Sequence, residues 1–128
     1  MQRLRRFLLI AAMIMIIAAC MMAPLRKEPV DITKIPDGVY VGTAGSWLNQ
    51  ADVRVTVRGG VMTDILLTRH WASCIGRQAE PVVPKRIIEK QSPDVDAVTG
   101  ATSSSRVIMH AVYNALEQGV RMSAGAPP

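Results

Sequence analysis

The stretch that decides the fold is ADVRVTVRGGVMTDILLT, residues 51–68. Its first half alternates strictly between apolar and polar residues, as in a strand with one buried face. The apolar face consists of Val53, Val55 and Val57. The glycine pair at 59–60 can adopt the positive backbone angles of a tight turn, and residues 61–68 then return as the partner strand. The stretch therefore predicts an antiparallel β-hairpin.

Three further patterns flank the hairpin. The run VYVGTA at 39–44 is rich in β-branched and aromatic residues and predicts another strand. KRIIEK at 85–90 predicts a short helix that ends before Pro93. Residues 107–120 predict a longer amphipathic helix that stops near Gly119. Its apolar face consists of Ile108, Ala111, Val112, Ala115 and Leu116.

Together these patterns predict an α+β fold, in which a small twisted antiparallel sheet packs against the C-terminal helix. The folded domain is expected to span residues 36–121. Residues 21–35 contain two prolines and mixed charges without a sustained period, which indicates a tether. Residues 122–128 are expected to be a flexible tail. A domain of this size is near the lower limit for a single core, so a bound cofactor would be a natural supplement.

The N-terminus, residues 1–20, has the order of a signal peptide: a basic start, then an apolar run, then small residues. The residues before Cys20, Ile-Ala-Ala, resemble the bacterial lipobox, in which the cysteine is lipidated and becomes the new N-terminus. The alternative is an uncleaved anchor over residues 7–25, which is close to the length that spans a bilayer. Both alternatives predict an extracytoplasmic domain held at a membrane.

The net charge of +5 does not indicate a nucleic-acid binder. Three of the 15 Lys and Arg residues lie in the predicted leader, and the other 12 are scattered among 10 acidic residues without a basic run. Cys74 lacks a second cysteine outside the leader, so it is expected to be a small buried residue. His70, Cys74 and His110 lack a fourth ligand, and no metal site is expected.

The segment DAVTGATSSS, residues 96–105, concentrates one acid and five hydroxyl side chains directly before the predicted helix. Thr102 or Ser103 could simply cap the helix N-terminus. The same N-terminus could instead bind an anion such as phosphate, and the small pair Gly100-Ala101 would let a bulky group approach the backbone. The residues alone leave both alternatives open.

The nonapeptide DAVTGATSS, residues 96–104, resembles the signature of the FMN-binding domain family: an acid, two variable residues, then Ser/Thr-Gly-Ala-Thr-x-Thr and a helix. The family includes the C subunit of sodium-pumping NADH:quinone reductase and the G subunit of Rnf-type electron-transport complexes. The similarity covers about residues 36–119, including the opening at residues 37–42. It implies that a separate flavin transferase, using FAD, esterifies the last hydroxyl of the motif with the phosphate of FMN.

Counting along the motif puts the acceptor at Ser104, where the family usually has threonine. The resemblance also implies that Asp96 belongs to the sequence that the transferase reads. The other residues that it implies to be cofactor-binding are Thr99, Gly100, Ala101, Thr102 and Ser103. Tyr40, Trp47 and Trp71 could stack on the isoalloxazine ring or belong to the core.

The expected function is a membrane-tethered flavoprotein that carries electrons between partners that the sequence does not name. It is expected to be a redox carrier or an electron-transfer subunit rather than a stand-alone enzyme. The alternative is a non-redox lipoprotein, a binding or assembly module that retains the fold without flavin. In that case the hydroxyl-rich segment would be a helix cap only.

Overall fold

The computed structural model describes residue 1, residue 6 and residues 8–13, 29–45 and 47–125. Cys20, with its predicted lipidation, lies outside the described residues. Within the described ranges, no helix is both long and apolar enough to cross a membrane. The elements are η1 (Ile32–Lys34), β1 (Gly38–Gly45), β2 (Gln50–Arg58), β3 (Val61–Trp71), η2 (Gly76–Ala79), α2 (Val83–Lys90) and α3 (Thr102–Ser123).

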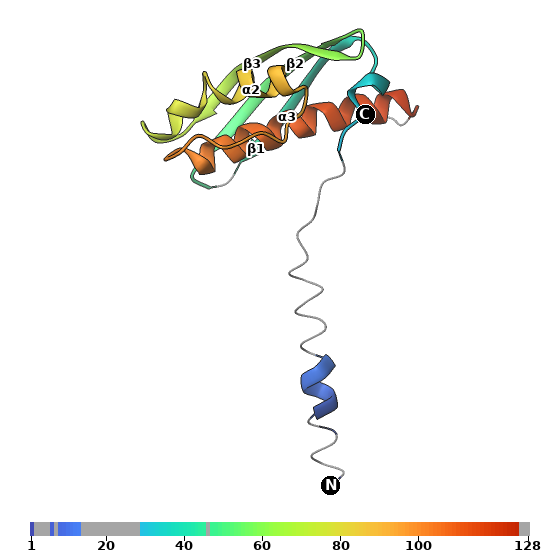
Figure 1. The fold of residues 1–128 in the computed structure, drawn as a ribbon, viewed down its shortest axis with the longest axis vertical. Helices are drawn as coiled ribbons and strands as arrows, with labels where there is room; N and C mark the ends of the chain where they lie inside the picture. Colours follow the sequence, from blue (N-terminus) through green and yellow to red (C-terminus); the bar gives the residue numbers. More distant parts are fainter. Residues whose placement is uncertain (2–5, 7, 14–28, 46, 126–128) are drawn as a thin grey trace.

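The predicted hairpin is confirmed by β2 and β3, which pair in antiparallel orientation. Gly59 and Gly60 form the turn with φ angles of +58° and +75°, which glycine adopts without steric cost. β1 pairs with the other side of β2, so the sheet has the order β1-β2-β3. In the view of Figure 1, α3 lies in front of the sheet, and α2 lies beside β3. The predicted α+β class is therefore confirmed.

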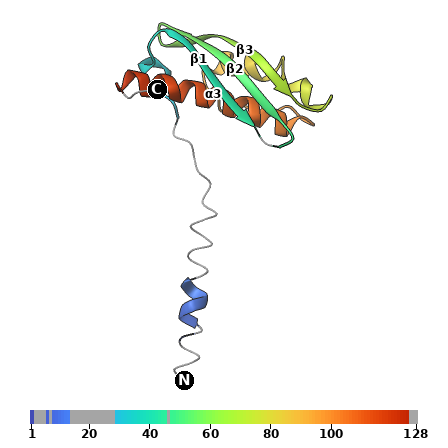
Figure 2. The same cartoon turned by 180° about the vertical axis from the view of Figure 1, so that it is seen from behind.

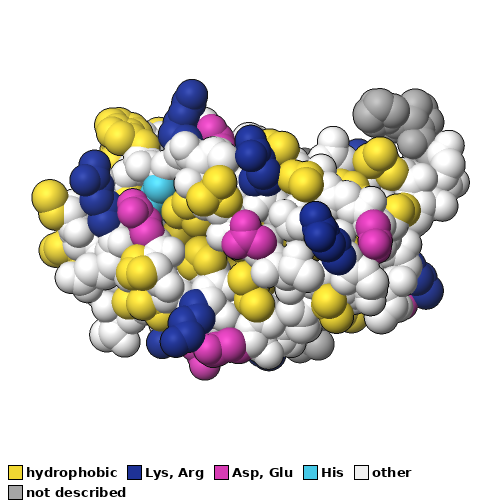
Figure 3. Space-filling model, turned by 90° about the horizontal axis from the view of Figure 1, so that it is seen from above, with side chains coloured by type: hydrophobic (Ala, Val, Ile, Leu, Met, Phe, Trp, Pro, Cys, Tyr) yellow, Lys and Arg dark blue, Asp and Glu magenta, His cyan; other side chains and the backbone are white. Residues whose placement is uncertain are grey.

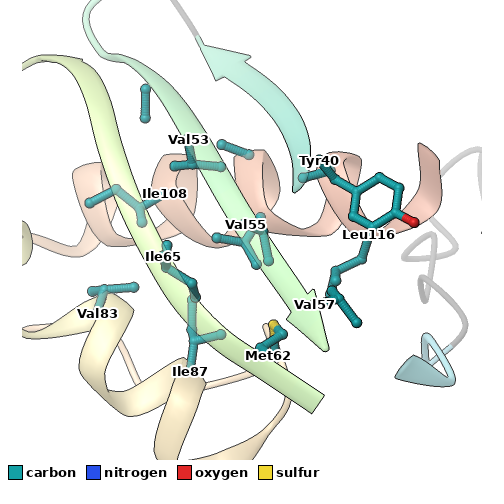
Figure 4. Close-up of a cluster of buried hydrophobic side chains, with 14 of the residues drawn as sticks. Tyr40, Val53, Val55, Val57, Met62, Ile65, Val83, Ile87, Ile108 and Leu116 are labelled. Carbon is teal, nitrogen blue, oxygen red and sulfur yellow. The ribbon is translucent and has the colours of Figure 1, made fainter. Parts of the chain in front are cut away.

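The core lies between one face of the sheet and α3. The three valines of β2 are fully buried, and Tyr40 and Ile65 of the neighbouring strands lie beside them (Figure 4). All five residues of the predicted apolar face of α3 have no exposed surface, so that face is also confirmed. Seen from behind, the sheet lies in front of α3 and turns its other face outward (Figure 2).

β1 and α3 approach each other closely at Gly42. A Cβ atom at this position would collide with the carbonyl oxygen of Ala111 and the backbone of Ala115. The prediction that α3 stops near Gly119 is wrong, because the helix continues to Ser123. Gly119 instead leaves room for the side chains of Ile35 and Tyr40. Glycine at positions 42 and 119 therefore lets the sheet, the helix and the segment before β1 pack together.

Both helices begin earlier than their sequence patterns predict. α2 starts at Val83 because Pro84, which lacks an amide hydrogen, is tolerated in a first turn. α3 starts at Thr102, five residues before the predicted start. The hydroxyl-rich segment thus forms the first turn of α3.

The segment before β1 also contributes to the core. Ile32 and Ile35, which the sequence pattern assigns to the tether, are buried at 7% and 3% exposure. On the face shown in Figure 3, Lys and Arg side chains are interspersed with Asp and Glu side chains. The ion pairs on the helices, such as Arg121 with Glu117, are exposed and add little to stability.

Candidate functional site

The N-terminus of α3 meets two other segments at one end of the sheet. Asn49, directly before β2, contacts Ser103 and Ser104 of α3. Gly76, the first residue of η2, lies against Ser104, because a Cβ atom on this glycine would collide with the Ser104 hydroxyl. Three segments that are far apart in the sequence therefore surround the hydroxyls of the motif.

The structure divides these hydroxyls into exposed and buried pairs. Thr102 and Ser103 are exposed, whereas Ser104 and Ser105 are 2% and 0% exposed. The Ser105 hydroxyl donates to the carbonyl of Ala101 at 2.8 Å and accepts from the amide of Val98 at 3.0 Å. Ser105 therefore fastens the preceding loop to the first turn of the helix.

Of the two alternatives for the hydroxyl-rich segment, a helix cap made by Thr102 or Ser103 is not found in the structure. The cap position is Ala101, and no side chain caps the helix there. Among the described residues, no hydrogen bond is made by the backbone amides of Thr102, Ser103 and Ser104. These amides and the positive end of the helix dipole are therefore available to an anion.

Asn49 is the site residue that sequence reasoning missed. Its side chain is 8% exposed, and its Nδ2 donates to the Ser103 hydroxyl at 2.8 Å. The Ser104 hydroxyl donates to its Oδ1 at 3.3 Å. Asn49 lies more than 50 residues from these serines in the sequence and belongs to no recognisable motif, so only the fold reveals the contact.

The burial of Ser104 bears on its predicted role as the attachment point. Its hydroxyl is enclosed by Asn49 and Gly76, so a phosphate could reach it only if these neighbours moved. Thr102, the first residue of α3, is exposed. Attachment at Ser104 stays a prediction, but Thr102 is the more accessible hydroxyl.

The loop before α3 presents the acid of the motif to solvent. Asp96 and Thr99 are exposed, and Gly100 has a φ of +83°, a conformation that favours glycine. Nη1 of Arg86, on α2, donates to the main-chain carbonyl of Asp96 at 2.8 Å. Arg86 therefore binds the backbone of the loop, and Asp96 is exposed to solvent.

Exposed apolar side chains lie near the hydroxyls at the same end of the molecule. Trp47 precedes Asn49 by two residues and is 85% exposed, and Trp71, 64% exposed, ends β3 opposite Gln50. Ile75 is 58% exposed and lies near Gly100, since a Cβ on that glycine would be 3.9 Å from its Cγ2 atom. These exposed side chains could contact a planar aromatic ring.

Tyr40 does not belong to this surface. It is 4% exposed and lies in the core, where its hydroxyl donates to the carbonyl of Pro36 at 2.7 Å. Burial raises the pKa of this phenol above its usual value, and the negative charge of Asp37 raises it further. Of the three candidate aromatic residues, only Trp47 and Trp71 are exposed.

The prediction that Cys74 is buried is wrong, because it lies exposed in the turn between β3 and η2. Nδ1 of His70 lies 2.8 Å from a carboxylate oxygen of Glu80, so this histidine is engaged in a side-chain pair. Within the part of the chain that the structure describes, no group of three or more His, Cys, Asp or Glu residues is placed to hold a metal ion.

The family model of the FMN-binding domain matches residues 46–117, more than half of the 128 residues. The match includes Asn49, η2 and the whole motif from Asp96 to Ser104. No curated protein matches the chain. FMN is therefore the cofactor. The site fits this cofactor in two respects: the unbonded amides of the first turn of α3 suit its phosphate, and exposed tryptophans nearby suit its ring.

Proposed function

The chain belongs to the FMN-binding domain family, and on this premise we propose that it is a membrane-tethered electron carrier whose FMN is held by a phosphoester bond. That it is an FMN-binding flavoprotein follows from the family. The covalent bond, the tether and the electron transfer are the proposal. The predicted leader, with its apolar run before Cys20, supports the tether and an extracytoplasmic location.

One observation carries the covalent attachment. The first turn of α3 offers an exposed threonine hydroxyl beside backbone amides that no side chain caps. A phosphodiester at Thr102 would keep one negative charge close to those amides, where the helix dipole stabilises it. We therefore favour Thr102 as the attachment point over Ser104, the residue that motif counting predicts.

The attachment is a transfer of an FMN group from FAD, carried out by a flavin transferase. The Thr102 hydroxyl oxygen forms a bond to the phosphorus of the FMN half, and the pyrophosphate P–O bond breaks. AMP leaves, and the hydroxyl proton passes to a base of the transferase. Asp96 is exposed and lies six residues before Thr102, so we propose that the transferase recognises its carboxylate.

The chain supplies position and surroundings rather than redox chemistry. FMN accepts or donates one or two electrons when bound. The amides of Thr102, Ser103 and Ser104 would hold the phosphate, while Trp47 and Trp71 would contact the ring. A covalent bond suits an extracytoplasmic protein, because a dissociated flavin would be lost to the surroundings.

Intact mass spectrometry tests the proposal on full-length chain co-expressed with a flavin transferase. The expected protein is yellow after denaturation and heavier by one esterified FMN. Digestion at basic residues should yield the peptide 91–106 with the added mass on Thr102. Thr102→Ala should abolish the addition, whereas the matched control Ser104→Ala should retain it.

The opposite pattern in these variants would put the ester at Ser104. A colourless protein of unmodified mass, produced beside a transferase shown to be active on another substrate, would contradict covalent attachment. If FMN added in solution also failed to bind, the chain would fit the alternative of a non-redox binding or assembly module.

A further inference from the structure

We infer that Asn49 is a positioning residue that directs the FMN phosphoester to Thr102 by occupying the two neighbouring hydroxyls. This inference rests on the proposed function, since it concerns the choice among acceptors. The segment from Thr102 to Ser105 contains four consecutive residues with hydroxyl side chains. A specific attachment therefore requires that three of them be withheld.

Each serine of this segment has a hydrogen-bonding partner in the structure. The Ser103 hydroxyl accepts from Nδ2 of Asn49, and the Ser104 hydroxyl donates to Oδ1 of the same side chain. Ser105 is fully buried and is bonded to the backbone of the preceding loop. Among the residues that the structure describes, Asn49 is thus the side chain that engages both Ser103 and Ser104.

Ser103 is the acceptor most in need of such control. Unlike Ser104 it is exposed, and it follows Thr102 directly, so a transferase that reaches one hydroxyl could reach the other. On an α-helix the two side chains diverge by about 100°. The bond from Asn49, at 2.8 Å, holds the Ser103 oxygen toward the sheet and occupies one of its lone pairs.

The side chain of asparagine suits this role because one planar amide carries both a donor and an acceptor. Asn49 donates to Ser103 and accepts from Ser104 at the same time. Its backbone position is fixed by Gln50, which begins β2 and pairs with both Gly45 and Trp71. The sheet therefore determines where the amide meets the helix.

The test uses full-length chain co-expressed with a flavin transferase, and it compares wild type, Asn49→Ala and the neighbouring control Gln50→Ala. Fragmentation of the peptide 91–106 gives the ratio of ester on Ser103 to ester on Thr102. Wild type and Gln50→Ala should carry FMN predominantly on Thr102, with the same low ratio of ester on Ser103 to ester on Thr102. In Asn49→Ala the ratio should rise by about fivefold or more, as the loss of one hydrogen bond implies.

A rescue variant separates this role from a purely structural one. If Asn49 acts by withholding Ser103, then Asn49→Ala combined with Ser103→Ala should again carry all its FMN on Thr102. Thermal unfolding is measured on every variant. An Asn49→Ala protein with a lower unfolding temperature but an unchanged ester ratio would overturn the inference and leave Asn49 as a structural clamp.

Should Asn49→Ala fail to fold, Asn49→Leu provides the second variant. Leucine is similar in size and shape to asparagine but can neither donate to Ser103 nor accept from Ser104. The ester ratio should rise in this variant as well, and an unchanged ratio would contradict the inference. Failure of the proposed function would give another result. The wild-type protein itself would then carry no FMN or would carry it on Ser104.

Discussion

Tyr40 is a buried side chain that makes the stability of the fold depend on pH. Its hydroxyl donates to the carbonyl of Pro36, which requires the protonated phenol. Burial, and then the charge of Asp37, raise the pKa of Tyr40 above its usual value of 10.0. The folded state therefore holds this proton more tightly than the unfolded chain does. The resulting stabilisation is complete below pH about 10 and is lost as the pH rises through the raised pKa.

Tyr40→Phe should remove this dependence. At neutral pH the variant is expected to be less stable by about 1 kcal/mol, the net value of one hydrogen bond. Above pH about 10 the free energy of unfolding should fall more steeply for wild type, by up to ~1.4 kcal/mol per pH unit for one proton. Urea unfolding at a series of pH values measures both effects. Parallel curves for the two proteins at high pH would contradict the prediction.

The residues of the site differ in how far sequence could predict them. Asp96, Thr99 and Gly100 stand in one contiguous motif, so a local pattern is enough to propose them as site residues. The exposure of Thr102 and the burial of Ser104 depend on η2 and on the segment before β2, which no local pattern places. Asn49 could not be found at all, because its contacts with Ser103 and Ser104 exist only where two distant segments meet.

Among the helices and strands, the start of α3 differs most from its prediction, since the helix begins at Thr102 and not at residue 107. Hydrophobic periodicity reports the buried face, and the first large apolar residue on that face is Ile108. Ser104 and Ser105 are also buried, closer to the N-terminus of the helix. Their side chains are small and polar, so a pattern of apolar residues does not identify them as part of the core. Serine and threonine also favour loops in isolation, and here tertiary packing overrides that preference.

Gln91 connects α2 to β3. It ends α2 in the left-handed conformation, with a φ of 53°, which is unfavourable for residues other than glycine. Its side-chain amide compensates by bonding both the amide and the carbonyl of Met62, at 2.7 and 2.9 Å, and the carbonyl of Ile88. These contacts lie beside the irregularity in the pairing of β2 with β3 at Val57.

Two substitutions at Gln91 separate backbone strain from hydrogen bonding. Gln91→Ala should lose about 1–3 kcal/mol of stability, because it removes the side-chain bonds and keeps the left-handed strain. Gln91→Gly loses the same bonds but relieves the strain, so it should be more stable than the alanine variant by about 1 kcal/mol. Urea unfolding of the three proteins gives both differences. Equal stability of the two variants would mean that the left-handed backbone at position 91 does not lower the free energy of unfolding.

For the whole molecule, the sequence predicts the hairpin and the α3 face well, because both arise from regular local periodicity. It does not predict how far the folded unit extends toward the N-terminus. Ile32 and Ile35 stand between prolines and charges, and so they read as part of a tether. Their burial depends on the close approach that Gly119 permits, which is a property of the assembled fold.

Truncation from the N-terminus tests this extent. A chain that begins at residue 29 keeps η1 and both isoleucines, and it should unfold like the full-length protein. A chain that begins at residue 36 loses two buried side chains, each worth about 1.5–3 kcal/mol. Part of that loss is offset because fewer residues need to be ordered, so a net loss of roughly 2–4 kcal/mol is expected. Urea unfolding of the two truncated chains measures it, and equal midpoints would show that the domain is complete from residue 36, as the sequence pattern predicts.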